Sequence, residues 1–496
     1  MMAQTSDEIL SELALIQVPR EVLNRIHSTS LDILKEVGIK FPDEDSLNVL
    51  AEFGAEVDRK SQVARIPESL VKESLSRVPR NLILYSRDGQ RDIRLGDGKS
   101  HFITSGVGVY IYDLETGTRR PANTNDTVNI SRIVDFLPNI DVLQVMVSPS
   151  DVPDKVADYY KFEAAFNNTT KHVSNCIGPI TSDEGAREIV EMSSIVAGGR
   201  GELMKRPIMS VHQAPVSPLQ YSASGLKAMN EYAKSKVPIC IYSMPMGGGT
   251  SPVTLAGTLV ILNSEFLAGL VLLQSISPGA PLMYGSVASI MDLKTGLLPI
   301  GAPERAILSV GAVNLGKYYG LPTLVAGGGT DAKIPGTRTG IEKTWTALPV
   351  VLAKADLIIG AGALDSASTY SYEQLIIDDE IAGGLTRIAR GLEFNEETLA
   401  ADVIKKVGIG GHFLAEKHTL NHVRTEQWFP QLYRRVQKPE ESWDFQKLGE
   451  TDLAVEAREK AKLILKTHHP KPLEADVRNK IRSLVEAAHR RALTMQ

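Results

Sequence analysis

The sequence predicts an α/β protein built on a closed (β/α)8 barrel, and two observations support that prediction. Between residues 99 and 375, short apolar segments alternate with longer segments of helical periodicity. The alternation repeats until eight strands are counted, nearly all of them followed by a helix. Alternating strands and helices indicate a parallel sheet, and eight units of this size favour a closed barrel over an open doubly wound sheet.

The barrel prediction rests on individual segments. Strands are expected at 102–104, 141–147, 172–175, 208–212, 239–242, 281–284, 323–326 and 357–359. Helices are expected at 125–136, 155–166, 183–196, 219–234, 253–276, 304–318 and 340–354. Each strand is short and contains Val, Ile or Leu, which suits a buried parallel strand.

Two extensions flank the predicted barrel. Residues 1–98 form an expected α+β extension, with helices at 20–37, 43–53 and 66–78 and short strands at 82–85 and 92–95. Residues 376–496 form an expected helical extension, with long polar helices at 454–466 and 474–494. The chain is therefore divided into three parts, with the catalytic barrel in the middle.

Composition excludes several classes of protein. The 496 residues are 43% hydrophobic and carry a net charge of −5, without a basic run, so no nucleic-acid partner is expected. Only two cysteines occur and the first residues are acidic and polar, which favours the cytoplasm over a secreted protein. The apolar segment 255–276 contains Asn263, Glu265 and Gln274, so a core helix is expected there and no membrane partner.

The predicted strand ends meet at one mouth, where parallel barrels bind their ligands. This mouth is rich in glycine, including Gly247, Gly248, Gly327, Gly328 and Gly329, and poor in charge. The glycines lack the spacing of a phosphate-binding or dinucleotide fingerprint, and they suit either close packing or the approach of a flat macrocycle. The mouth has no cluster of carboxylates and histidines that would indicate a metal site. His418 and His422 have a spacing that could bind zinc, but the glutamate of the zinc-protease motif is missing.

Aromatic residues gather in the loops around the mouth. They are Tyr110, Tyr112, Trp345, Tyr370 and Tyr372, in a chain with only 6% aromatic residues. Aromatic faces hold quaternary ammonium groups by cation–π attraction, although each ring could instead serve only to pack its loop. Cys176 and His212 lie at strand ends, where a small core residue and a hydrogen-bonded structural histidine are the simpler interpretations.

Charged groups near these rings complete a candidate site. Asp331 and Glu373 are the predicted catalytic residues, as anionic groups beside an ammonium, and Asp365 is a further candidate. His212, Arg338 or Lys343 could bind a substrate carboxylate.

Three segments resemble a known family. They read GGGTDAKIPGTRTGIEK, GALDSASTYSYEQLIIDDEIAGG and GHFLAEKHTLNHVRTEQWFPQLYRR, and they are similar to the trimethylamine methyltransferase superfamily of corrinoid-dependent methyltransferases. The resemblance implies a (β/α)8 barrel, in agreement with the independent strand count. It also implies methyl transfer from an amine to the Co(I) corrinoid of a separate protein that docks over the mouth. The corrinoid would then face Gly247, Gly248 and Gly327–Gly329 without being bound permanently.

The resemblance also suggests the substrate. Founding members of the family carry pyrrolysine, whereas this chain contains only the twenty standard residues and is similar to the branch that uses quaternary amines. Glycine betaine, proline betaine, carnitine and γ-butyrobetaine are the expected candidates. A quaternary ammonium loses its methyl group as a neutral amine, so the enzyme needs positioning and desolvation rather than an acid–base pair.

Two other functions remain open at this stage. A barrel lyase or aldolase could use Lys333 as an imine-forming amine if burial lowered its pKa. A non-catalytic betaine-binding protein would use the same aromatic cage without turnover. The exposed C-terminal helices and the family resemblance also suggest a homo-oligomer.

Overall fold

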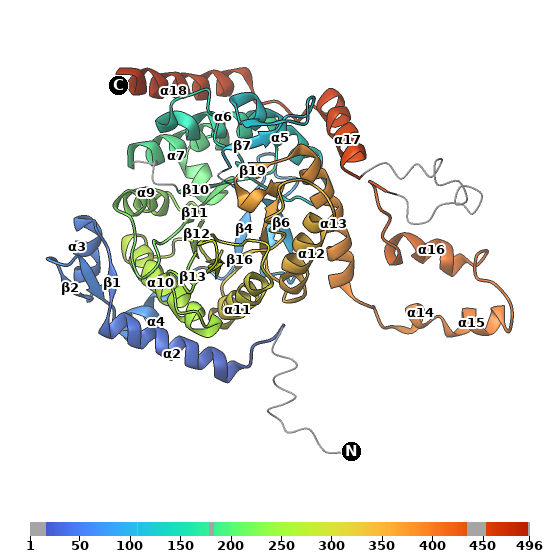
Figure 1. Ribbon diagram of the computed structural model, residues 1–496, viewed down its shortest axis with the longest axis horizontal. Coiled ribbons are helices and arrows are strands. Elements are labelled where there is room, and N and C mark those ends of the chain that lie inside the picture. Colours follow the sequence, from blue (N-terminus) through green and yellow to red (C-terminus); the bar gives the residue numbers. More distant parts are fainter. Residues whose placement is uncertain (1–15, 107, 178–182, 434–452, 495–496) are drawn as a thin grey trace, which may run out of the picture.

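A closed barrel of eight parallel strands forms the centre of the molecule (Figure 1). The computed structural model describes residues 16–106, 108–177, 183–433 and 453–494. The barrel strands are β6 (His101–Thr104), β9 (Val142–Gln144), β10 (His172–Ile177), β11 (Met209–Gln213), β12 (Ile239–Ser243), β14 (Leu282–Ser286), β16 (Thr323–Ala326) and β17 (Leu357–Ala361). All eight coincide with predicted strands, so the predicted fold class is confirmed.

The barrel closes between its last strand and its first. Leu357 of β17 lies beside His101 of β6 in a parallel pair, and the register shifts once between Ile359 and Ala361. Inward-facing side chains such as Ile103, Val142 and Leu324 fill the interior, and the barrel strands are buried along almost their whole length.

Helices cover the outside of the barrel. The layer consists of α5 (Thr124–Phe136), α6 (Ala157–Asn168), α7 (Asp183–Ala197), α8 (Arg200–Lys205), α9 (Ala223–Lys234), α10 (Leu255–Ile276), α11 (Pro303–Tyr319), α12 (Thr337–Leu352) and α13 (Tyr372–Arg390). Local sequence sets their starts: the Asn123 and Asp126 side chains form a capping box on α5, and the Ser371 hydroxyl accepts from the amide of Gln374 on α13. The predicted boundary at residue 375 falls inside α13, so the barrel unit continues to Arg390.

Helix α10 is long and apolar enough to cross a membrane by length and composition alone. However, 72% of its most apolar window is buried inside the molecule, where it packs against α2 (Arg20–Glu36), α4 (Glu68–Arg77) and α11. The helix is therefore a core helix, as its polar residues Asn263 and Glu265 predicted.

The N-terminal extension attaches to the barrel in two places. Helices α2, α3 (Glu44–Glu52) and α4 pack on α10, around a small sheet of β1 (Ile39–Lys40), β3 (Val63–Arg65) and β2 (Glu56–Asp58). The hairpin of β4 (Leu82–Leu84) and β5 (Ile93–Leu95) places Leu82, Leu84, Ile93 and Leu95 in the same buried cluster as the barrel interior. The hairpin is not part of the barrel wall, yet its side chains pack against those that fill the barrel interior. The hairpin therefore closes one end of the barrel.

The C-terminal extension has two parts. Helices α17 (Leu453–Thr467) and α18 (Ala475–Thr494) lie against α13, α5, α6 and α7. The short helices α14 (Glu396–Leu399), α15 (Ala401–Val407) and α16 (Lys417–Glu426) project away from the barrel (Figure 1).

The hairpin that closes the barrel should contribute substantially to stability. Leu84 is fully buried, so Leu84→Ala should lower the free energy of unfolding by about 2–5 kcal/mol, because it removes apolar contacts and leaves a cavity. Denaturant unfolding followed by circular dichroism measures the change. Val37→Ala, at an exposed position, is the control, and an equal loss in both variants would contradict the role of the hairpin.

Candidate active site

A small sheet covers part of the barrel mouth. It contains β18 (Ala363–Leu364), β19 (Thr369–Tyr370), β7 (Tyr110–Tyr112) and β8 (Arg119–Pro121), in that order. In this sheet β19 pairs in parallel with β7, with Thr369 beside Tyr110 and Tyr370 beside Ile111. The sheet therefore brings together the loops that follow β6 and β17, which are far apart in sequence and adjacent in the barrel.

Three side chains, Cys176, His212 and Tyr242, meet at the upper end of the barrel interior. Tyr370 lies close enough to interact electrostatically with Cys176 and Tyr242, and we call these four residues the interior cluster. The His212 ring meets the Tyr242 ring edge-on at 5.2 Å, and the Tyr242 hydroxyl contacts the Cys176 sulfur. His212 Nε2 lies 2.9 Å from the Ser174 hydroxyl, and His212 Nδ1 has no hydrogen-bond partner in the described chain. The ring of Tyr370 approaches Gly108 so closely that any side chain there would collide with it.

Burial keeps the interior cluster neutral. It lowers the pKa of His212 to about 3 and raises the pKa of Cys176 to about 11. It also raises the pKa of both Tyr242 and Tyr370 above the ordinary tyrosine value. At neutral pH the cluster offers two phenols, a thiol and a neutral imidazole. It is therefore poorly suited to proton transfer and suited to binding an uncharged or cationic group.

Further polar atoms near these strand ends lack partners. The amide oxygen of Gln144 is buried and has no hydrogen-bond partner within the described residues, as is the case for His212 Nδ1. Buried polar groups are normally paired, so unpaired atoms at the end of a barrel are expected where a ligand or water binds.

A buried ion pair fixes the two glycine loops beside the cluster. Lys343 Nζ donates to the carbonyl oxygens of Gly328 and Gly360 and to Asp378 Oδ2, at 2.9, 3.1 and 2.8 Å. Asp378 Oδ2 also accepts from the amide of Gly362 at 2.7 Å. Lys343 was expected to be available for a substrate carboxylate, but its ammonium group is fully used in holding the loops after β16 and β17.

Asp331 also has a local role. Its carboxylate accepts from the amides of Ile300 and Gly301 at 2.8 and 3.0 Å and from the Ser366 hydroxyl at 2.7 Å. These bonds join the loops that follow β14, β16 and β17. The geometry gives Asp331 an anchoring role and no support for the predicted catalytic one.

Tyr110, Tyr112 and Asp365 lie together around Arg119. The Arg119 guanidinium lies 3.6 Å from the centre of the Tyr110 ring and 3.7 Å from the Asp365 carboxylate. The Tyr112 hydroxyl donates to the backbone carbonyl of Lys333 at 2.8 Å. One face of Tyr110 is thus already covered by a cation from the same chain, and these residues stabilise the covering sheet.

Tyr372 and Glu373 lie in the helix layer. The Tyr372 hydroxyl donates to Asp126 of α5 at 2.7 Å, and the Glu373 carboxylate pairs with Arg458 of α17 at 2.7 Å. Both side chains are buried between α13 and its neighbours. They attach helices to one another, and the structure does not bring them to the interior cluster.

Trp345 and Arg338 lie on α12, outside the barrel. The Trp345 ring nitrogen donates to the Gly301 carbonyl at 2.7 Å, and the side chain remains 43% exposed. Arg338 is largely exposed and pairs with Glu342 one turn further along α12, at 2.7 Å. Neither side chain contacts the interior cluster in the structure.

The predicted corrinoid-facing glycines divide into two groups. Side chains at Gly327 or Gly329 would collide with Ile358 or with the carbonyl of Ile300, and one at Gly247 would press on Thr258. Gly328 and Gly248 have positive φ angles of 68° and 91°, and no atom lies within 3.4 Å of an added Cβ at either position. Close packing therefore explains three of these glycines, and two remain open to an approaching ligand.

The residues predicted from the sequence do not include Tyr242, Gln144 or Arg119. Alternation along β12 places Cys240 and Tyr242 on one face, and both belong to the buried cluster inside the barrel. The alternation along a strand could have indicated Tyr242 once the inward face was known. Arg119 gave no such signal, because its position depends on the pairing of β7 with β19.

Other candidate chemistry finds no support. Lys333 is exposed, so burial cannot activate it for an imine mechanism. His422 pairs with Glu397 at 3.1 Å, and no group of three or more potential metal ligands occurs within the described ranges.

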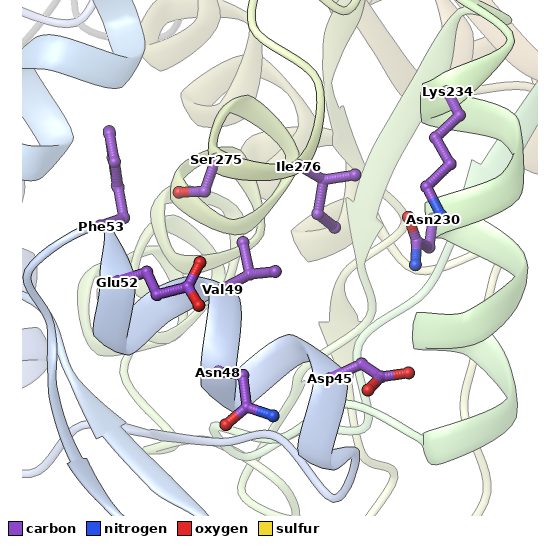
Figure 2. A pocket seen from close by; sticks show the side chains of 9 residues that line it. All are labelled: Asp45, Asn48, Val49, Glu52, Phe53, Asn230, Lys234, Ser275 and Ile276. Atoms are coloured by element: carbon purple, nitrogen blue, oxygen red, sulfur yellow. The ribbon is translucent and has the colours of Figure 1, made fainter.

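Cavities also lie away from the mouth. Figure 2 shows one of about 510 Å³, lined by residues of α3, α9 and α10 such as Glu52, Lys234 and Ile276. Its residues on α9 and α10 come from the last turns of these helices, which lie at the opposite end of the barrel from the mouth. It contains none of the predicted site residues, so we assign it no part in the chemistry.

The geometry defines a closed parallel barrel with a neutral, aromatic cluster in its interior, and comparisons with known proteins identify its family. A family model described as Trimethylamine methyltransferase (MTTB) matches residues 2–493. The trimethylamine methyltransferase MttB of Desulfitobacterium hafniense is 38% identical over 466 residues, covering 94% of this chain and 92% of the relative. The corresponding Methanosarcina barkeri protein is 36% identical, with 94% of each chain covered. A glycine betaine methyltransferase of D. hafniense is 32% identical, covering 93% of this chain and 95% of the relative.

The chain belongs to the trimethylamine methyltransferase family, and its relatives are methyltransferases. Among solved structures, the monomethylamine methyltransferase MtmB of Methanosarcina barkeri covers 92% of this chain and 93% of its own. Its sequence identity is 11% and its TM-score is 0.48. The barrel assignment made here comes from the strand pairing of this chain.

The Lys343–Asp378 pair should be essential for the loops at the mouth. Lys343→Met should lower the free energy of unfolding by about 3–5 kcal/mol, because it leaves the Asp378 carboxylate buried without its cation. Adding Asp378→Asn should recover part of that loss. Denaturant titration measures both variants, with Lys72→Met on the surface as the control. A double variant less stable than Lys343→Met would contradict the electrostatic explanation.

A second buried carboxylate fixes the loop after β11. Glu265 on α10 accepts from the amide of Leu219 and from the Ser217 hydroxyl, both at 2.9 Å. Burial raises the pKa of Glu265 from 4.5 to about 7. The folded chain therefore binds this proton more tightly than the unfolded chain does.

The raised pKa of Glu265 predicts that the free energy of unfolding depends on pH. As pH rises from about 4.5 to about 7, the contribution of Glu265 to the free energy of unfolding should fall by at most about 3 kcal/mol, and it should be constant above pH 7. Glu265→Gln should remove this component. Denaturant titrations of both proteins at pH 5, 6, 7 and 8 test it, and parallel pH profiles would show that Glu265 does not titrate in this range.

Proposed function

We propose that this chain moves a methyl group from a quaternary amine to the Co(I) corrinoid of a separate protein. Glycine betaine or a related betaine such as proline betaine, carnitine or γ-butyrobetaine is the proposed donor. The relatives are named for trimethylamine and for glycine betaine, so a methylated amine is common to both. The chain has no pyrrolysine, which favours the quaternary donor.

The observation that carries this proposal is the neutral interior cluster. Tyr242 and Tyr370 provide aromatic faces in a buried setting, where cation–π attraction is strongest. A quaternary ammonium has no N–H group, so it needs no carboxylate or other acceptor to bind. A site made of phenols, a thiol and a neutral imidazole matches that requirement.

The same residues explain how transfer could proceed. The C–N bond breaks, its electron pair stays on nitrogen, and the amine leaves neutral without taking a proton. The Co(I) corrinoid, as the methyl-accepting substrate, supplies a strong nucleophile. The interior cluster excludes water and orients the ammonium, so that one methyl group points out of the barrel mouth.

The rim of the mouth supports a macromolecular acceptor. Large apolar side chains are exposed in the loops that follow five of the barrel strands, β6, β11, β12, β14 and β16. They are Val109, Val216, Met244, Leu293, Leu297 and Ile334. Exposed apolar patches of this kind mark interaction surfaces. Together with the uncovered backbone at Gly328 and Gly248, these side chains suit the docking of a flat corrin and the protein that carries it. We further propose that the chain works in the cytoplasm as a homo-oligomer.

An anaerobic assay with reduced corrinoid protein, and separately with free cob(I)alamin, tests the reaction. Glycine betaine, proline betaine, carnitine, γ-butyrobetaine, choline and trimethylamine are offered in turn, and the spectral change from Co(I) to methyl-Co(III) is followed. We expect methylation by at least one quaternary amine. Activity with trimethylamine alone would overturn the proposed donor class, and no activity with any amine would overturn the proposed reaction.

Binding variants test the site separately from turnover. Tyr370→Ala should raise the dissociation constant of the active betaine about 30-fold, since a buried cation–π contact contributes about 2 kcal/mol. Tyr370→Phe keeps the ring and should change it little. Isothermal titration calorimetry measures both, with Trp345→Ala as a control outside the cluster. An equal effect at Trp345 would return that residue to the site.

A further inference from the structure

Residues 391–424 form an arm without a core of its own. They include α14, α15 and most of α16, and none of these helices contains a buried residue or packs broadly against another described element. The arm leaves the barrel after Arg390, the last residue of α13, and projects away from it (Figure 1). Helices this short are not stable alone in water, so the arm needs a surface to cover it.

The composition of the arm points to the same need. Large apolar side chains are exposed along its whole length, including Phe394 at 77%, Leu414 at 86% and Leu420 at 76%. The first part of the arm, residues 391–402, also carries Glu393, Glu396, Glu397 and Asp402 and no basic residue. It therefore presents apolar and acidic groups together.

A groove of opposite character lies at the root of the arm. Its volume is about 550 Å³, and Phe102, Val351 and Trp428 contribute apolar lining. Lys99, Lys354 and Arg424 also line it, and none of these cations lies within ion-pair distance of a described carboxylate. Asp141 is the single carboxylate in the lining, and it is engaged with His101. The groove is thus basic around an apolar floor.

Arm and groove occupy the same end of the molecule. The groove is lined by the starts of β6 and β9 and by the ends of α12 and α13, so it lies at the opposite end of the barrel from the mouth. In a two-fold pair the same patch meets itself, so each arm could enter the groove at the root of the other arm. Such a contact would leave both mouths free.

We propose that residues 391–424 clasp a second copy of this chain, and that the acidic, apolar segment 391–402 lies in the basic groove of that copy. The inference rests on the proposed self-association and is independent of the proposed substrate. The contact between the two copies then lies at the arm and at the groove beside its root, and the mouth takes no part in it.

Sedimentation equilibrium of the full chain, without substrate or corrinoid, measures the assembly. We expect a two-fold assembly in the wild type. The double variant Phe394→Asp, Leu399→Asp should raise the dissociation constant of the assembly about 100-fold or more. Each substitution removes an apolar side chain from the interface and replaces it with a carboxylate that favours water. Both are exposed in the single chain, so circular dichroism and thermal melting should show an intact barrel.

Charge reversal tests the groove. Lys99→Glu with Lys354→Glu should weaken the assembly, and Glu393→Lys with Glu396→Lys should weaken it equally. Combining all four changes should restore it, which general damage to the fold could not do. Lys227→Glu with Lys234→Glu, on the other side of the barrel, is the matched control and should have no effect.

Each contrary result overturns a different part. A monomeric wild type would overturn self-association itself. A wild-type oligomer that the arm variants leave intact would overturn the arm. Weakening without rescue by the four-fold variant would overturn the groove.

Discussion

The buried ion pair between Lys343 and Asp378 holds the mouth of this barrel in shape. A single ammonium group joins a carbonyl from the loop after β16 and a carbonyl near the end of β17 to a carboxylate on α13. The glycines in these loops could not by themselves fix one conformation, because glycine has the most backbone freedom. The ion pair supplies the missing restraint. This need for a restraint explains why a charged pair lies within an otherwise apolar layer.

Charge is used in the surroundings of the site and is absent from the interior cluster. Asp331, Asp365 and Glu373 pair with groups of the same chain and join loops or helices to one another, and Arg338 pairs with Glu342 within α12. The groups that meet inside the barrel are neutral at physiological pH because burial opposes their ionisation. This division suits a reaction in which the leaving group needs no proton and the donor itself brings the positive charge.

The two ends of the barrel have different surfaces. The mouth presents exposed apolar side chains from five loops around the interior cluster. The opposite end is closed by the β4–β5 hairpin and carries the arm with its basic groove. Separating these surfaces would let a methyl acceptor approach one end while another copy of the chain occupies the other.

The sequence by itself determined the barrel, its eight strands, the order of its helices and the family to which the chain belongs. These depend on local periodicity and on contiguous motifs, which a single chain displays directly. Only the tertiary structure decided which aromatic residues meet. Tyr370 reaches the interior because β19 pairs with β7, whereas its near neighbour Tyr372 begins a helix and turns toward Asp126. Two residues so close in sequence face different layers, because a strand end and a helix start orient their side chains differently, and no periodicity spans that junction.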